Sequence, residues 1–125
     1  MARKIKGLTY EQKMVDALNK LPNPLLDKRH DILIYLVNNK VRNNESRFDH
    51  IIDSRHELNT NDIKRISKNI KKAILKKDRD RKDTFNLYIR RKNYGEEYIK
   101  ISLKIEAKNP KEAEIRTIYI TKNVK

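Results

Sequence analysis

Hydrophobic residues recur with two different periods along this chain, and the change of period divides it. In the first half, apolar residues recur every three or four positions, which is typical of helices that bury one side. In the last third they recur at every second position, which is typical of strands in a half-buried sheet. The pattern predicts an α+β fold, in which N-terminal helices are followed by a basic helix packed on a three- or four-stranded antiparallel β-meander.

Two helices are predicted in the N-terminal part of the chain. Thr9 and Gln12 form a capping box at the start of the first helix, and the two prolines of residues 22–24 end it. The second helix buries an apolar stripe formed by Leu26, Ile32, Leu33, Leu36 and Val37. A polar segment then marks the boundary between an N-terminal helical region, residues 1–45, and a functional domain, residues 46–125.

Two more helices are predicted in the functional domain. A short one starts at Ser46, which forms a second capping box with Asp49. After a polar turn at residues 53–57, a longer helix starts near Asn59. Its apolar positions share one side: Ile63, Ile66, Ile70, Ala73 and Ile74. Its opposite side is crowded with basic residues: Lys64, Arg65, Lys68, Lys71 and Lys72.

Three strands are predicted at the C-terminal end, over residues 85–90, 99–106 and 117–121. Isoleucine, leucine and phenylalanine occupy one face of the strands, so this face is expected to pack against the helices. The segment Asn93-Tyr94-Gly95 supplies a hairpin turn between the first two strands. The other face carries cationic and hydroxyl-bearing residues that suit a phosphate backbone: Tyr88, Arg90, Lys100, Lys104, Thr117, Tyr119 and Thr121.

The charge balance indicates a polyanionic partner. The 31 lysine and arginine residues outnumber the 17 acidic residues and give a formal net charge of +14. Such an excess repels itself in the folded state, and nucleic acid is its usual compensation. The chain has no cysteine, which excludes disulfides and thiolate chemistry. Its longest apolar run, residues 32–37, is too short to span a bilayer, so we expect no membrane partner and a cytoplasmic location, in the producing or the target cell.

The residue types in this domain suit RNA cleavage without a metal. Such cleavage needs a base for the 2′-hydroxyl proton, an acid for the leaving 5′-oxygen, and fixed cations for the phosphorane. His56 is the preferred acid or base, because it stands in a polar turn beside Arg55 and histidine titrates near neutrality. A structural role stays open for it, since a turn histidine more often supports the fold.

Metal catalysis finds less support. Asp78, Asp80 and Asp83 are interspersed with basic residues that offset their charge, and no His-x-x-x-His spacing occurs. No metal or other cofactor is therefore expected.

The stretch from Phe48 to Thr121 resembles the BECR-fold nucleases, the superfamily of barnase, EndoU, colicin-type tRNases and RelE-like toxins, with phage- and toxin-associated branches. The resemblance rests on residues 49–56, on the amphipathic helix after them, and on residues 115–121. It implies a metal-independent ribonuclease, often a toxin, with a histidine before the helix and a threonine in the last strand at the site. The implied partners are RNA, tRNA included, and an acidic immunity or antitoxin protein. The first 45 residues have no counterpart in the resemblance.

These observations together predict a toxin-like, metal-independent endoribonuclease that cleaves RNA by 2′-OH attack on the adjacent phosphate. The catalytic candidates are His56, Thr117, Tyr119 and Arg90. The nucleic-acid-binding candidates are Arg55, His50, Lys100, Lys104, Tyr88, Thr121, Lys68 and Lys72. Two alternatives stay open: a non-catalytic basic RNA- or DNA-binding module, and a phage-encoded inhibitor that docks on an acidic partner.

Overall fold

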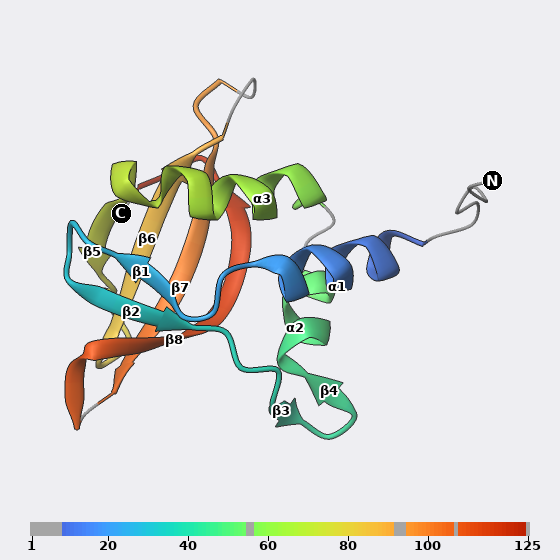
Figure 1. Ribbon diagram of the computed structural model, residues 1–125, viewed down its shortest axis with the longest axis horizontal. Coiled ribbons are helices and arrows are strands. Elements are labelled where there is room, and N and C mark those ends of the chain that lie inside the picture. Colours follow the sequence, from blue (N-terminus) through green and yellow to red (C-terminus); the bar gives the residue numbers. More distant parts are fainter. Residues whose placement is uncertain (1–8, 55–56, 92–94, 107, 125) are drawn as a thin grey trace.

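Helices pack on a curled, mixed β-sheet in a computed structural model, which describes residues 9–54, 57–91, 95–106 and 108–124 (Figure 1). The helices are α1 (Tyr10–Lys20), α2 (Arg47–Ser54) and α3 (Thr60–Asn69), with a 3₁₀ turn at Ile70–Lys72. The strands of the main sheet are β1 (Leu25–Asp27), β2 (Ile32–Tyr35), β5 (Ile74–Lys77), β6 (Thr84–Arg90), β7 (Tyr98–Glu106) and β8 (Asn109–Thr121). The short strands β3 (Lys40–Arg42) and β4 (Glu45–Ser46) pair separately.

The six main strands lie in the order β1-β2-β8-β7-β6-β5. Strands β5 to β8 form an antiparallel meander, whereas β2 runs parallel to β8 and antiparallel to β1. The α+β class and the C-terminal meander are therefore confirmed, and the sheet is larger than predicted because N-terminal strands extend it. The division of the chain at residue 45 stays a prediction, although the sheet takes strands from both sides of that position.

The helices begin where the capping signals predict. Thr9 accepts a hydrogen bond from the Gln12 N–H, and the Gln12 side chain accepts one from the Thr9 N–H. Ser46 and Asp49 form the same reciprocal pair before α2. Asn59 caps α3 in the same way. Each signal involves residues three positions apart, so it depends on no distant partner.

The predicted second helix is wrong, because residues 25–35 form the hairpin of β1 and β2. Burial alternates along β1, so Leu25 is buried while Leu26 is 44% exposed. A short apolar run is ambiguous between helix and strand, and the partner that decides here is β8, far along the chain. The Asn23 side chain bonds both backbone groups of Leu36 beside a cis Asn23–Pro24 peptide bond.

The predicted long helix is also shorter than its apolar pattern suggests. It ends at Asn69, and Ile74 opens the edge strand β5 instead of continuing the helix. The Ala73 side chain stays fully buried, whereas that of Ile74 is 41% exposed. Strand β5 is only four residues long, and its sequence Ile-Leu-Lys-Lys does not alternate, so it cannot be separated from the helical pattern before it.

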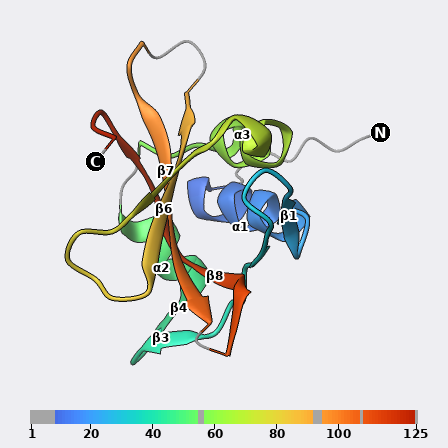
Figure 2. The ribbon, with the colours of Figure 1, turned by 90° about the vertical axis from the view of Figure 1, so that its left-hand side faces the viewer.

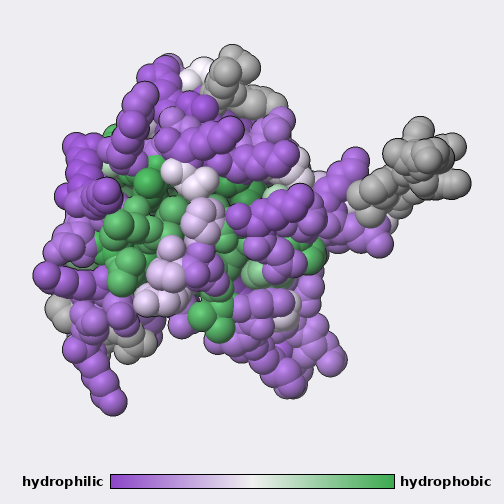
Figure 3. Space-filling view, in the orientation of Figure 1, coloured by the Kyte–Doolittle hydropathy of each residue, from purple (hydrophilic) through white to green (hydrophobic). Residues whose placement is uncertain are grey.

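The two faces of the sheet differ in what covers them. Helices α1 and α3 lie on one face, whose apolar side chains they bury (Figure 2). Figure 3 shows this side, where hydrophilic side chains surround apolar ones over β1. On the other side, α2 lies along β8 and the β5–β6 loop projects away from the sheet (Figure 2). Within the described residues, no helix is long and apolar enough to cross a membrane.

Candidate active site

The open face of the sheet carries polar side chains in cross-strand rows. One row consists of Asn86, Ser102 and Thr117. The neighbouring row, two residues along each strand, consists of Tyr88, Lys100 and Tyr119. Side chains two positions apart on a strand point to the same face. The three central strands therefore place a row of amide and hydroxyl groups beside a lysine that stands between two tyrosines.

These rows form the floor of a polar pocket of about 260 Å³. Helix α2 supplies one wall, and the β5–β6 loop supplies another. The lining residues are His50, Asp78, Asp80, Arg81, Asn86, Lys100, Ser102, Thr117 and Tyr119. Three separate parts of the chain thus meet over the open face, and between them they can transfer a proton, donate hydrogen bonds and hold an anion.

Helix α2 is fixed against β8 by a buried arginine. A β-bulge leaves Arg116 without a cross-strand partner in β7. The Arg47 Nη1 donates to the Arg116 carbonyl at 2.6 Å, and burial, with the neighbouring Arg116 charge, lowers the pKa of Arg47. His50 lies one helical turn after Arg47 and reaches the pocket. The His50 Nδ1 is 3.6 Å from the Glu45 Oε1, which is beyond hydrogen-bond distance, so this contact is electrostatic.

Lys100 is held half-buried between two aromatic rings. Its Nζ lies 5.2 Å from the ring centre of Tyr119 and 5.7 Å from that of Tyr88, within the range of cation–π attraction. Burial lowers the pKa of Lys100, but the hydrogen bonds and charge interactions with Tyr119 and Tyr88 together outweigh it, so the pKa lies above its ordinary value of 10.5. The pocket floor therefore carries a fixed cation at neutral pH.

Asp78 organises the β5–β6 loop. Its Oδ1 accepts hydrogen bonds from the N–H groups of Asp80 and Arg81, both at 2.9 Å, and its Oδ2 accepts one from the Asn86 Nδ2 at 3.2 Å. The Asn86 bond first, then the two N–H groups and nearby Lys100, hold the pKa of Asp78 below its ordinary value of 3.8. A carboxylate held this way is a weak base. Asp78 therefore positions the loop and the Asn86 amide.

Two buried oxygens of the pocket have no hydrogen-bond partner in the described part of the chain, the Asn86 Oδ1 and the Thr117 Oγ1. The Asn86 side chain is fixed in direction, because its nitrogen, the donor, must face the Asp78 carboxylate. An unpaired buried acceptor costs about 1–3 kcal/mol, so such atoms are normally satisfied. The pocket is thus suited to an occupant that donates N–H or O–H.

The formal charges around the pocket cancel. Lys100 and Arg81 are opposed by Asp78 and Asp80. Asp80 and Arg81 are exposed residues of the loop, whereas Lys100 stands on the sheet. The pocket as a whole therefore does not attract anions through its net charge. A phosphate would be held at one place, beside Lys100.

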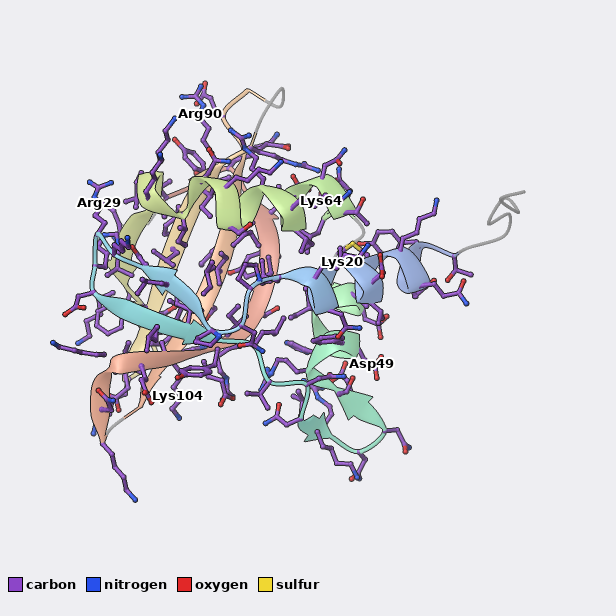
Figure 4. The ribbon with its side chains drawn as sticks, in the orientation of Figure 1. Lys20, Arg29, Asp49, Lys64, Arg90 and Lys104 are labelled. Carbon is purple, nitrogen blue, oxygen red and sulfur yellow. The ribbon has the colours of Figure 1, made fainter. Side chains whose placement is uncertain are left out.

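Four of the predicted residues meet in this pocket: His50, Lys100, Thr117 and Tyr119. Tyr88 joins them through its contact with Lys100. Arg90, Lys104 and Thr121 lie on the same strands but do not line the pocket, and Figure 4 shows Arg90 and Lys104 at opposite ends of the sheet.

The remaining predicted residues lie elsewhere. Lys68 lines a hollow between α1 and α3, on the covered side of the sheet, and Lys72 ends the 3₁₀ turn after α3. Lys68 is therefore separated from the pocket by the sheet, and Lys72 does not line the pocket. Arg55 and His56 lie outside the described residues, so their roles stay predictions.

Sequence reasoning missed five members of the site: Asp78, Asp80, Arg81, Asn86 and Ser102. The strand alternation does place Asn86 and Ser102 on the polar face, but an amide or hydroxyl there is unremarkable without knowledge of its partners. Asp78 was considered only as a metal ligand. Its position depends on the loop conformation, which the sequence pattern does not specify.

Comparisons with known proteins found no matching family model, no matching curated protein and no matching solved structure. The resemblance to the BECR-fold nucleases therefore stays a prediction. Among the described residues, no group of three or more histidine, aspartate or glutamate side chains is arranged to hold a metal ion.

Proposed function

We propose that this protein is a metal-independent, toxin-like endoribonuclease whose active site is the pocket between α2, the β5–β6 loop and the open sheet face. The observation that carries the proposal is the meeting of His50 with Lys100 and Tyr119 over that face. They supply a proton-transfer group, a fixed cation and a hydroxyl. RNA suits the site because its 2′-hydroxyl is the nucleophile and its phosphates attract a chain with a charge of +14.

The reaction forms a bond between the 2′-oxygen and phosphorus and breaks the bond from phosphorus to the 5′-oxygen. The 2′-hydroxyl loses its proton to a base, and the leaving 5′-oxygen gains one from an acid. His50 carries out one of these transfers, and the Tyr119 hydroxyl is the second proton-bearing group. Lys100 offsets the charge of the phosphorane. The products carry a 2′,3′-cyclic phosphate and a 5′-hydroxyl.

His50 thus takes the acid–base role predicted for His56. The sequence favours His56 over His50 for this role, but His50 comes from the helix that forms the pocket wall. The Arg47 contact with β8 fixes that helix, so the imidazole is held over the strands that carry Lys100 and Tyr119.

The test is cleavage of a labelled single-stranded RNA by purified protein in the presence of EDTA. We expect fragments with cyclic phosphate ends, and a fall in kcat/KM of about 10²–10⁴-fold for His50→Ala, the usual value of one acid–base group. Asp53→Ala, an exposed change on the same helix, serves as the control and should keep the activity.

Three outcomes would contradict the proposal. A requirement for a divalent metal would exclude the metal-independent mechanism. Full activity of His50→Ala would remove the histidine from the chemistry. RNA that is bound but left intact would favour the non-catalytic binding module, which uses the same surface without cleavage.

A further inference from the structure

We infer that the floor of the pocket reads the base of the bound nucleotide and selects bases with an amino group at purine C6 or pyrimidine C4, adenine and cytosine. The inference rests on the proposed function in one respect, because it takes a nucleotide of RNA as the occupant. It concerns binding rather than cleavage, so it can be tested where no cleavage occurs.

The Asn86 amide is the main observation. The residue is 3% exposed and lines the pocket, and its Oδ1 is buried with no hydrogen-bond partner among the described residues. The hydrogen bond from Nδ2 to Asp78 prevents the amide from turning, so the pocket is offered an acceptor. Protein amides read bases through such atoms, and an amino group is the donor that a base edge supplies.

Depth and charge decide which part of a nucleotide reaches this acceptor. Asn86 and Ser102 are 3% and 4% exposed, whereas the His50 side chain at the wall is 29% exposed. A phosphate is expected at Lys100, because the charges of the remaining lining residues do not favour an anion. The deeper row is neutral, and it therefore suits the edge of a base. The Tyr119 ring beside that row can stack on the face of the same base.

Replacing the amino group by a carbonyl would place an oxygen against the Asn86 Oδ1. The two acceptors would repel each other, and the buried oxygen would stay unpaired. A site built around a hydrogen-bonding group discriminates strongly against an analogue that lacks it. A bound water could satisfy the same oxygen, but a water would give no preference among bases.

The experiment measures the Kd of four mononucleotides by NMR titration of the intact protein. They form two matched pairs, AMP with IMP and CMP with UMP, and each pair differs by an amino group against a carbonyl. We expect AMP and CMP to bind on the order of tenfold more tightly than their partners. Asn86→Ala should bring both ratios close to one. Lys100→Ala should weaken all four nucleotides and leave the ratios unchanged.

Asn61→Ala, an exposed asparagine change on α3, is the matched control and should keep both ratios. If Asn86→Ala does not fold, Thr117→Val removes the other unpaired oxygen with little change of shape, and it should also reduce the preference. Selective binding without RNA cleavage would support the inference while the nuclease proposal fails. Equal Kd values within each pair, or the absence of nucleotide binding, would overturn the inference whether or not RNA is cleaved.

Discussion

Lys100 is the side chain on which the proposed chemistry most depends, because the other formal charges of the pocket, Arg81 against Asp78 and Asp80, leave a net negative charge without it. Lys100→Ala should lower kcat/KM for RNA cleavage by about 10²–10³-fold, the value typical of one preorganised group at a developing charge. Lys111→Ala makes the same charge change at an exposed position of β8 outside the pocket, and it should stay within about twofold of the unchanged protein. Equal losses for the two variants would show that net charge, not position, is what matters.

Asp78 should stabilise the β5–β6 loop at neutral pH, and this contribution should be lost in acid. Its pKa lies below 3.8 in the folded chain and returns to that value on unfolding, so its contribution is present above about pH 3.8 and is lost as pH falls through the folded-state pKa. Asp78→Asn should therefore have a lower Tm than the unchanged protein at neutral pH, and the gap should narrow in acid.

The control for this loop is Asp80→Asn, since the Asp80 carboxylate accepts no hydrogen bond from the described residues. Its Tm should follow that of the unchanged protein at every pH. A gap for Asp78→Asn that stays constant from neutral pH to below about pH 3.8 would contradict the assignment.

At the scale of residues, the sequence predicts the strand-borne part of the site and little else. Lys100, Thr117 and Tyr119 were placed on one face because side-chain direction in a strand follows a period of two. The role of Asn86 depends on which way its amide turns, and Asp78 decides that from a loop. Such a contact depends on the folded conformation of the loop, which no sequence period describes.

At the scale of elements, the two capping boxes next to the helices predicted where those helices start. Strand pairings between segments far apart in the chain could not be predicted. The two predicted capping boxes, at Thr9 and Ser46, located the starts of α1 and α2 because each is complete within four residues. The segment 25–35 became a hairpin because β8 accepts β2 as a parallel neighbour. The contact of Arg47 with the Arg116 carbonyl also joins distant parts of the chain, and the placement of α2 and hence of His50 depends on it.

The hairpin between β6 and β7 should depend on Arg91 for its connection to α3. Its side chain is 6% exposed, and it donates to Asp62 at 2.9 Å, to Glu97 at 2.8 Å and to the Glu57 carbonyl at 2.7 Å. Arg91→Met would leave the buried Asp62 carboxylate without this cation, so we expect a loss of about 3 kcal/mol in the free energy of unfolding.

Urea unfolding measures this loss, and the neighbouring residue provides the control. Arg90 is exposed, so Arg90→Met should change the free energy of unfolding by less than about 0.5 kcal/mol. Similar values for the two variants would mean that the ion pairs of Arg91 do not hold the hairpin against α3.

At the scale of the whole molecule, the sheet separates two surfaces. One face is closed by α1 and α3, and the other stays open between α2 and the β5–β6 loop (Figure 2). The basic residue Lys68 belongs to the closed side, so it does not share a surface with Lys100, and its contact with nucleic acid stays a prediction. Charge on the far side still contributes to the field that attracts a polyanion, but it cannot contact an RNA bound in the pocket.

The affinity for RNA should therefore fall strongly as the salt concentration rises, although only a few cations contact phosphates. If about four cations touch phosphates, log K should fall by about 2.8 for each tenfold rise in salt, because each contact with a single strand contributes about 0.7. Lys100→Ala should reduce that slope by one contact, whereas Lys68→Ala should leave it unchanged. Fluorescence anisotropy with a noncleavable 2′-deoxy oligonucleotide at several salt concentrations measures both slopes. A slope near zero would instead favour docking on an acidic protein, and an effect of Lys68 equal to that of Lys100 would mean that RNA binds across both faces.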